Sequence, residues 1–563
     1  MKLCSRLPSL SLLTFLLAAR VVVAASVMPE RAAIASAHPL ASQAGVEILA
    51  NGGNAFDAAV AVSAALGVVE AVGSGLGGGG LFLLHRESDG LRVMIDGREV
   101  APSAAEHDMY LDASGEPMAR ASRDGPLAAG IPGLPAALVH LAEHYGRLPL
   151  EESLQPAIRY ARDGYQADAS LADRLIRRGR SMNPAARAVF LPGGDPAAGG
   201  GKVLQKDLAA TLTALAQRGF DGFYRGDVAA KLVEGVRAGG GIWTLEDLAS
   251  YRTVEREPLV GFYRGATVIS VPPPSSGGVA LINMLNILTG FDLDQADTVS
   301  RTHLLAEAMR RAYRDRAEFL GDTDFVDVPL DRLLHPFYAA GQRMGMRIDQ
   351  ATPSATLPGV LATGVAGGGD QTSHFSVLDA QGNIVAGTQS INFGYGSGFM
   401  PPETGVLLNN EMDDFSMKPG VANGYQLLGA EANAIAPGKR MLSSMTPTIL
   451  IDEHGLSVLG TPGGSRIITM VLLASLAWMD GADARMMVAL PRVHHQYFPD
   501  RISYESDALT AEQAVQLEAL GHSLDRVRGD YGNMHVVTWD FDTGRVDAAS
   551  DPRGIGEPRF HGP

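Results

Sequence analysis

Thr372 opens the strand-like run Ser373 to Leu378, and the stretch before it, Ala351 to Gln371, is rich in Gly, Ala, Thr and Pro. Such a composition is typical of a flexible linker. A threonine hydroxyl is a poor nucleophile until a base takes its proton, and a free N-terminal amine can be that base because it titrates near roughly 7.7 to 8.0. The segment is compatible with a precursor that cuts itself between Gln371 and Thr372. Taken alone, it fits an ordinary loop entering an ordinary strand better.

The residues that follow Thr372 predict a β-hairpin. Ser373 to Leu378 and Ile384 to Asn392 are two β-like runs joined by a short polar turn. A turn midway between them places Ser390 opposite Thr372, and cross-strand Cβ atoms lie roughly 4.5 to 5.5 Å apart. Alternation then puts Asn392 on the same face as Ser390. Three polar groups converge at one end of the hairpin, and this favours self-cleavage over an ordinary loop.

Length and charge limit the classes of function. The chain has 563 residues, 46% of them hydrophobic and 19% charged, so it can bury a large core in one big domain or two closely packed ones. Its formal net charge is -16. Such a charge argues against nucleic acid and anionic membranes as partners.

The first 25 residues have the pattern of a secretory signal peptide. Lys2 and Arg6 precede the apolar run Leu10 to Ala19, and small residues follow. Arg20 interrupts the pattern, so an uncleaved anchor is the alternative. The single cysteine, Cys4, lies in this segment, and the mature protein would have none. We expect a periplasmic or secreted protein without a stable membrane span.

Other motifs give little support to metal, nucleotide or serine-triad chemistry. The glycines from Gly75 to Gly80 are not followed by the Lys and Ser or Thr of a phosphate-binding loop. His494 and His495 are adjacent rather than at metal-ligand spacing, and neither His-Glu-x-x-His nor Gly-x-Ser-x-Gly occurs. We therefore expect no metal and no cofactor.

Several separate motifs are similar to those of one enzyme family, the γ-glutamyltranspeptidases, from about Ala35 to Arg553. The motifs that carry the resemblance are Asn51-Gly52-Gly53-Asn54-Ala55, Asp96-Gly97-Arg98-Glu99, Pro272-Pro273-Pro274-Ser275-Ser276-Gly277-Gly278, the Thr372 segment, Asn409-Asn410-Glu411-Met412-Asp413-Asp414-Phe415, Leu442-Ser443-Ser444-Met445 and Pro462-Gly463-Gly464-Ser465-Arg466. The family has the N-terminal nucleophile hydrolase fold, an αββα four-layer sandwich of the α+β type. The resemblance implies cleavage of residues 26–371, the large subunit, from residues 372–563, the small subunit, which stay together as a heterodimer.

The resemblance also implies catalytic roles. Thr372 matches the nucleophile, and Gln371 precedes the cleavage point. Ser390 stands where the family usually has a second threonine; it keeps the hydroxyl and lacks a methyl group, so we expect function to survive. Gly463 and Gly464 match the oxyanion hole, in which backbone N–H groups stabilise the developing negative charge.

The substrate roles implied by the resemblance agree with simple electrostatics. A γ-glutamyl group carries an α-carboxylate and an α-ammonium, so its site needs both a cation and an anion. The residues that match the carboxylate-binding set are Arg98, Ser443 and Ser444; those that match the ammonium-binding set are Asn392, Glu411 and Asp414. Without the resemblance, an ion-paired arginine and a solvated acidic loop are the simpler interpretations.

The expected function is a self-cleaving γ-glutamyltransferase and glutathione hydrolase that passes a γ-glutamyl group from Thr372 to water, an amino acid or a peptide. Lys418 to Gly429 matches the family's lid loop, with Tyr425 over the site, and this favours small donors such as glutathione. Two alternatives stay open. One is a β-lactam side-chain acylase of the glutaryl type on the same scaffold, and the other is a periplasmic γ-glutamyl-binding protein that never matures.

Overall fold

The strands of the computed structural model, which describes residues 27–167, 175, 178–192, 201–362 and 371–562, form two main sheets. The first sheet has the order β18 (Arg559–His561), β1 (Ala32–Ser36), β9 (Ser373–Leu378), β10 (Ile384–Ser390), β2 (Gly79–Arg86), β3 (Leu91–Gly97) and β6 (Val254–Arg256). The second has the order β17 (Val546–Ser550), β16 (His535–Asp540), β12 (Gly455–Gly460), β11 (Thr448–Ile451), β8 (Ala266–Ser270) and β7 (Leu259–Tyr263). Two small sheets pair β13 (Val493–His494), β14 (Ile502–Tyr504) and β15 (Leu524–Arg526), and β4 (Tyr165–Gln166) with β5 (Lys202–Val203).

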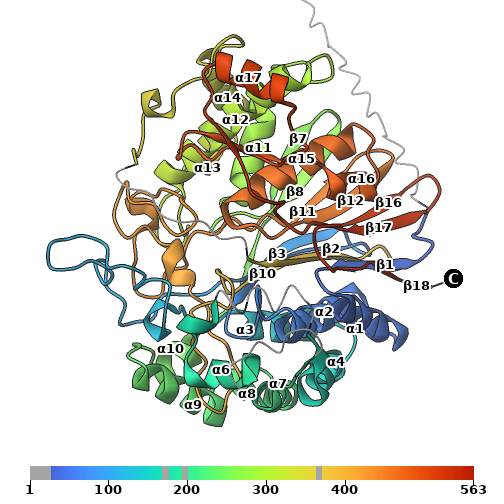
Figure 1. Ribbon diagram of the computed structural model, residues 1–563. Coiled ribbons are helices and arrows are strands. Elements are labelled where there is room, and N and C mark those ends of the chain that lie inside the picture. Colours follow the sequence, from blue (N-terminus) through green and yellow to red (C-terminus); the bar gives the residue numbers. More distant parts are fainter. Residues whose placement is uncertain (1–26, 168–174, 176–177, 193–200, 363–370, 563) are drawn as a thin grey trace, which may run out of the picture.

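Helices cover the outer face of each main sheet, as Figure 1 shows. On the first sheet lie α1 (Pro39–Ala50), α2 (Ala55–Val69), α3 (Leu134–His144) and α4 (Leu150–Asp163), with α6 (Pro184–Phe190), α7 (Lys206–Arg218), α8 (Phe220–Tyr224), α9 (Gly226–Ala238) and α10 (Leu245–Ser250) farther out. On the second lie α11 (Gly277–Leu288), α15 (Ile467–Met479) and α16 (Ala484–Ala489), with α12 (Thr298–Phe319), α13 (Leu330–Leu333), α14 (Pro336–Met344) and α17 (Ala511–Ala519) farther out. The expected αββα four-layer sandwich is therefore confirmed.

Strand alternation explains the layers. Leu81 and Leu83 of β2 belong to the apolar cluster between the two sheets, together with Ile449 from β11. Phe82 and Leu84, one residue out of phase, belong to the cluster under the first helical layer. Because successive side chains of a strand point to opposite faces, one strand contributes to two cores.

The predicted hairpin is present in the predicted register. β9 and β10 pair antiparallel with Ser373 opposite Gln389 and Leu378 opposite Ile384. This register continues to Thr372 and Ser390. β10 ends at Ser390, two residues earlier than we expected, because Asn392 adopts a left-handed backbone with φ of 73°.

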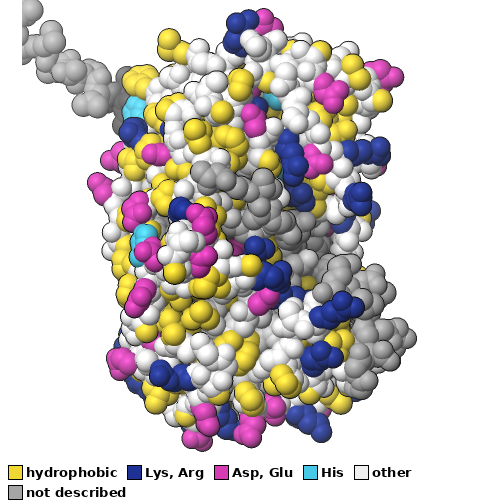
Figure 2. Space-filling view, turned by 60° about the vertical axis from the view of Figure 1, so that its left-hand side comes forward, with side chains coloured by type: hydrophobic (Ala, Val, Ile, Leu, Met, Phe, Trp, Pro, Cys, Tyr) yellow, Lys and Arg dark blue, Asp and Glu magenta, His cyan; other side chains and the backbone are white. Residues whose placement is uncertain are grey.

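The surface is mixed in charge. On the face shown in Figure 2, Lys and Arg side chains lie among Asp and Glu side chains. None of the described helices is both long enough and apolar enough to cross a membrane. The expected signal peptide and the glycine-rich end of the expected linker lie outside the described residues.

Candidate active site

Thr372 lies immediately before β9, in the interior of the first sheet, with 7% of its surface exposed. Its hydroxyl Oγ1 lies 3.3 Å from Oγ of Ser390. It also donates a hydrogen bond to the carbonyl oxygen of Gln371, which is the carbonyl of the expected cleavage point. The expected nucleophile therefore contacts the peptide bond that it would attack.

Ser390 is fixed by the backbone that follows it. The N–H of Asn392 donates to Oγ of Ser390 at 2.8 Å. The amide Nδ2 of Asn392 donates to the carbonyl of Asn410 at 3.0 Å, so its side chain is tied to the loop before Glu411. The left-handed turn, rather than strand alternation, brings Asn392 to the site.

Gly463 and Gly464 form a turn between β12 and α15. Their φ values are 142° and 55°, in the region that favours glycine. A Cβ on Gly464 would lie 2.3 Å from the ring of Tyr425, so the close approach also requires glycine. Among the described residues, neither N–H donates a hydrogen bond. Two free amides close to the start of a helix are suited to stabilise an oxyanion.

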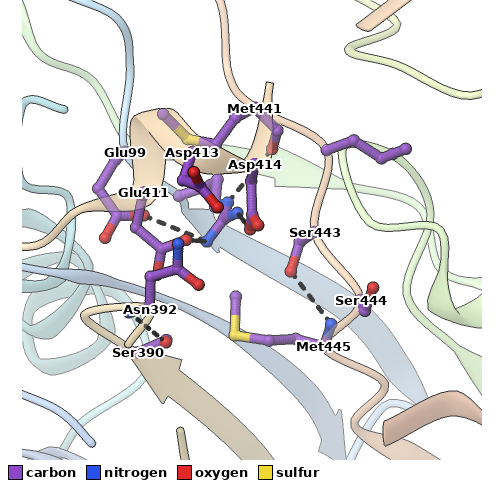
Figure 3. Close-up of polar contacts among 12 residues, drawn as sticks. Glu99, Ser390, Asn392, Glu411, Asp413, Asp414, Met441, Ser443, Ser444 and Met445 are labelled. Atoms are coloured by element: carbon purple, nitrogen blue, oxygen red, sulfur yellow. Dashed lines mark hydrogen bonds and ion pairs between the residues drawn. The ribbon is translucent and has the colours of Figure 1, made fainter. Parts of the chain in front are cut away.

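Arg98 is the centre of a buried ion cluster. Its Nη1 donates to Oε2 of Glu411 and its Nη2 to Oδ2 of Asp414, both at 2.6 Å, while Nε donates to the carbonyl of Met441 at 3.2 Å. A third carboxylate, that of Glu99, lies 3.6 Å away. Figure 3 shows Glu99, Glu411 and Asp414 gathered on one side of the site, with Ser443 and Ser444 across from them.

The cluster contains more acid than base, and this shifts its pKa values. Burial raises the pKa of Glu411 well above its usual range, although Arg98 opposes the shift. Burial likewise raises the pKa of Glu99 to about 8. For Arg98, burial alone would lower the pKa, but Glu411, Glu99 and Asp414 outweigh it and raise the pKa. Oε1 of Glu411 is buried without a hydrogen-bond partner among the described residues, so a cationic group is favoured beside it.

Ser443 and Ser444 face the cluster from a loop that is held by Pro274 and Ser276. The N–H of Ser443 donates to the carbonyl of Pro274 at 2.7 Å, and the N–H of Ser276 donates to the carbonyl of Ser443 at 2.8 Å. The N–H of Met445 donates to Oγ of Ser443 at 3.1 Å. Both serines are buried but adjoin the cavity.

The expected lid loop closes over the site through Tyr425. Its hydroxyl donates to the carbonyl of Asn392 at 3.0 Å, and its ring stacks on Phe393 at a centroid distance of 4.5 Å. The same loop is held at Gly424, whose N–H donates to Oδ2 of Asp413 at 2.7 Å. Burial raises the pKa of Asp413 to about 6.

Gln496 holds the same loop from the other side. Its Nε2 lies within hydrogen-bond distance of the carbonyls of Tyr425 and Gln426, at 3.1 and 3.0 Å, and of Phe498. Its Oε1 lies 2.8 Å from Nε2 of His494. Because only Nε2 of Gln496 can donate to carbonyls, Oε1 accepts, and His494 carries its proton on Nε2.

One cavity joins these groups. It is lined by Arg98, Thr372, Ser390, Asn392, Glu411, Asp414, Tyr425, Leu427, Ser443, Ser444, Met445, Gly464 and Ile467. Its volume is about 20 Å³, which is room for about one water molecule.

The structure places the predicted site residues around this one cavity, except Gly463 and Gln371, which are the chain neighbours of the lining residues Gly464 and Thr372. The chemical roles of all these residues stay predictions. Sequence reasoning gave no role to Glu99, Asp413 or Gln496. Glu99 and Asp413 belong to motifs that we quoted, so a signal for both existed. The contacts of Gln496 with the lid join distant segments and have no local signal.

One group of described side chains has the composition of a metal site, away from this cavity. His303, Glu307 and His522 bring their ligand atoms within 4.8 Å of one another. The two imidazoles hydrogen-bond each other at 2.8 Å, and both carboxylate oxygens of Glu307 are bonded, to Arg310 and Arg311. Since these atoms already have protein partners and two guanidinium groups lie beside them, the group does not fit a cation.

Comparison with known proteins agrees with this geometry. The family model described as Gamma-glutamyltranspeptidase matches residues 41–560. The chain is 42% identical to the glutathione hydrolase proenzyme of Escherichia coli (strain K12), over 93% of this chain and 90% of that one. It is 36% identical to the acylase ACY 1 proenzyme of Pseudomonas sp. (strain V22), over 94% and 93%.

Solved structures give the same picture. A cephalosporin acylase from Bacillus halodurans superposes with a TM-score of 0.82 at 28% identity, covering 95% of this chain and 96% of that one. The γ-glutamyltranspeptidase of Helicobacter pylori superposes with a TM-score of 0.56 at 39% identity, covering 60% of this chain and 96% of that one.

Proposed function

The chain belongs to the γ-glutamyltranspeptidase family, and on that basis we propose that it is a self-cleaving γ-glutamyltransferase and glutathione hydrolase. The observation that carries the proposal is the single cavity shared by the Thr372 hydroxyl, the oxyanion turn at Gly464 and the buried ion cluster around Arg98. Small molecules are its substrates: glutathione and other γ-glutamyl compounds as donors, and water, amino acids or dipeptides as acceptors.

Maturation begins with attack by Oγ1 of Thr372 on the carbonyl carbon of Gln371. The C–N bond between the two residues breaks, the nitrogen takes a proton, and an ester forms between Gln371 and the Thr372 side chain. Water then hydrolyses this ester and leaves a carboxylate on Gln371 and a free amine on Thr372. The hydrogen bond from Oγ1 to the Gln371 carbonyl supports this step, because it holds the two reacting groups together.

In turnover, the free amine of Thr372 takes the hydroxyl proton while Oγ1 attacks the γ-carbonyl of the donor. The N–H groups of Gly463 and Gly464 donate to the resulting oxyanion, and losing one such donor typically costs about 2.7 to 4 kcal/mol. The proton passes to the leaving amine, such as Cys-Gly, and the γ-glutamyl ester remains on Thr372. Water or an acceptor amine then attacks the ester and restores the hydroxyl.

Donor recognition uses the ion cluster. The α-ammonium binds beside the buried Oε1 of Glu411 and the carboxylate of Asp414, where an excess of acid favours a cation. Asn392 adds a polar amide. The α-carboxylate binds to Arg98 and to the hydroxyls of Ser443 and Ser444.

A cephalosporin acylase of the glutaryl type is the second candidate, since a solved structure named as a cephalosporin acylase shares the fold. A glutaryl group lacks the α-ammonium, so Glu411 and Asp414 would have no cation to bind. A substrate panel tests the choice, with γ-glutamyl and glutaryl amides of the same leaving group. We expect the γ-glutamyl donor to have the higher kcat/KM, and preference for the glutaryl amide would contradict the proposal.

We also propose a periplasmic or secreted location, supported by the basic and apolar composition of the first 25 residues. N-terminal sequencing of the large subunit purified from its own cell tests this, because export by this route leaves a chain that starts near residue 26. A chain that still begins at Met1 would contradict it.

A further inference from the structure

Arg316 is a buried arginine beside the candidate site that has no acidic side chain in contact within the described part of the chain, although the carboxylate of Asp414 acts on it from farther away. Arg316 lies on α12 with 4% of its surface exposed. Among the described residues, no carboxylate oxygen lies within 4.0 Å of its guanidinium nitrogens, although Arg310 and Arg311 on the same helix both pair with Glu307. A buried charge with no counterion in contact is costly, and an anion bound from outside the chain would lower that cost.

The hydrogen bonds of Arg316 lead to the predicted carboxylate-binding loop. Its Nε donates to Oγ of Ser276 at 3.0 Å, and its Nη2 lies 3.4 Å from Oγ of Ser444. Oγ of Ser276 in turn donates to the carbonyl of Ser443 at 2.7 Å. Arg316 therefore holds both serines from behind, one directly and the other through Ser276 of the Pro272 to Gly278 motif.

This arrangement leaves two hydroxyl protons available. Oγ of Ser444 accepts from Arg316, and Oγ of Ser443 accepts from the N–H of Met445. Within the described part of the chain, neither hydroxyl donates to an acceptor. When a hydroxyl oxygen already accepts a hydrogen bond, its O–H remains available to donate one. Two such donors beside a guanidinium group are suited to bind a carboxylate.

We propose that Arg316 is a positioning residue for the α-carboxylate of the donor: it orients the Ser444 hydroxyl, holds the backbone of Ser443 through Ser276, and supplies positive charge beside both serines. This inference rests on the proposed function. Both terminal nitrogens of Arg98 are bonded to acids, Glu411 and Asp414, whereas Arg316 has no acid in contact among the residues that the structure describes.

The test compares two donors that differ only in the α-group: a γ-glutamyl anilide and the same anilide with its α-carboxylate converted to a carboxamide. In the Arg316→Gln enzyme, we expect kcat/KM for the carboxylate donor to fall by about 10- to 100-fold, mainly through KM, because a charge-assisted contact is lost. The carboxamide donor should change by no more than about 3-fold. Self-cleavage should still reach completion. The matched control is Arg314→Gln, which removes a guanidinium from the same helix away from the cavity and should leave the ratio of the two donors unchanged.

Equal losses for both donors would show that Arg316 only supports the fold, and would overturn the inference. If Arg316→Gln does not mature, Arg316→Lys replaces it in the test, because lysine keeps the positive charge but cannot bond Ser276 and Ser444 at the same time, as arginine does. Arg316→Lys should raise KM for the carboxylate donor alone. An equal effect on both donors would again overturn the inference. Failure of the proposed function looks different, since the wild-type enzyme itself would then turn over neither γ-glutamyl donor.

Discussion

At the scale of single residues, the site depends on hydroxyl and charged groups that are each held by one hydrogen bond within the protein and keep another hydrogen-bonding position for a ligand or for the nucleophile. Oγ of Ser390 accepts the N–H of Asn392, so its own proton is free for Oγ1 of Thr372. Glu411 is similar, since one oxygen is bonded to Arg98 while the other is buried with no hydrogen-bond partner in the described ranges of the chain. Groups held in this way are preorganised for a ligand and lose little entropy when it binds.

Ser390 gives a direct test at this scale. We expect Ser390→Ala to slow both self-cleavage and turnover by about 10-fold or more, because one hydrogen bond to the nucleophile is lost. Ser390→Thr is the control: it keeps the hydroxyl and restores the residue usual in the family, so rates should stay within about 3-fold of wild type. Time courses of chain cleavage and of donor hydrolysis measure both. An alanine variant as fast as wild type would remove Ser390 from the mechanism.

Single residues also show what the sequence could and could not predict. The capping residues Asn54 and Asp57 at the start of α2 follow a local rule, and so does the pairing that sets Ser390 beside Thr372. The backbone turn at Asn392 and the contact of Arg316 with Ser444 depend on tertiary packing. No pattern in the neighbouring residues indicates them.

At the scale of elements, the lid is held between two supports. Asp413 bonds the backbone of Gly424 on one side, and Gln496 bonds the carbonyls of Tyr425 and Gln426 on the other. His494 orients Gln496 through its Nε2. Its other ring nitrogen, Nδ1, lies 2.9 Å from Oγ1 of Thr469 on α15, the helix that follows the turn at Gly463 and Gly464. The position of the lid is thus connected to the position of Gly464.

Loosening this connection should change donor selection. In Gln496→Leu, the lid carbonyls lose their donor, so we expect activity toward a bulky amide to rise relative to a small γ-glutamyl donor by about 3- to 10-fold. Gln516→Leu, on the exposed face of α17, is the control and should keep the wild-type ratio. The measurement is kcat/KM for the two donors. A ratio unchanged in Gln496→Leu means that the lid does not depend on this contact.

At the scale of the whole molecule, both expected subunits build the same sheets. β1, β2 and β3 come from residues before Thr372, whereas β9, β10 and β18 come from residues after it, and they alternate in one sheet. The second sheet likewise combines β7 and β8 with later strands. Cleavage before Thr372 therefore cuts the chain without separating its cores, and the two pieces should stay together until they are denatured.

Buried neutral histidines make the whole molecule sensitive to acid. Burial lowers the pKa of His494, His522 and His535 to about 3 and that of His495 to about 4. Because their ordinary pKa is 6.5, the unfolded chain binds more protons in the window between about 6.5 and 3, and stability falls as pH falls through that window. Each such histidine should cost about 1 kcal/mol between pH 7 and 5.5.

Unfolding midpoints measured from pH 8 to 5 test this sign. His535→Gln should flatten part of the decline, since neither ring nitrogen of His535 has a hydrogen-bond partner among the described residues. His454→Gln changes an exposed histidine and should keep the wild-type slope. A midpoint that rises steadily toward acid would contradict the assignment of neutral buried histidines.

The intact mass of the denatured protein tests the central claim most directly. Our account predicts two chains for the wild-type protein, the smaller beginning at Thr372, and one uncut, inactive chain for Thr372→Ala. A wild-type protein that stays uncut after prolonged incubation, or a Thr372→Ala variant that is still cut after Gln371, would contradict it.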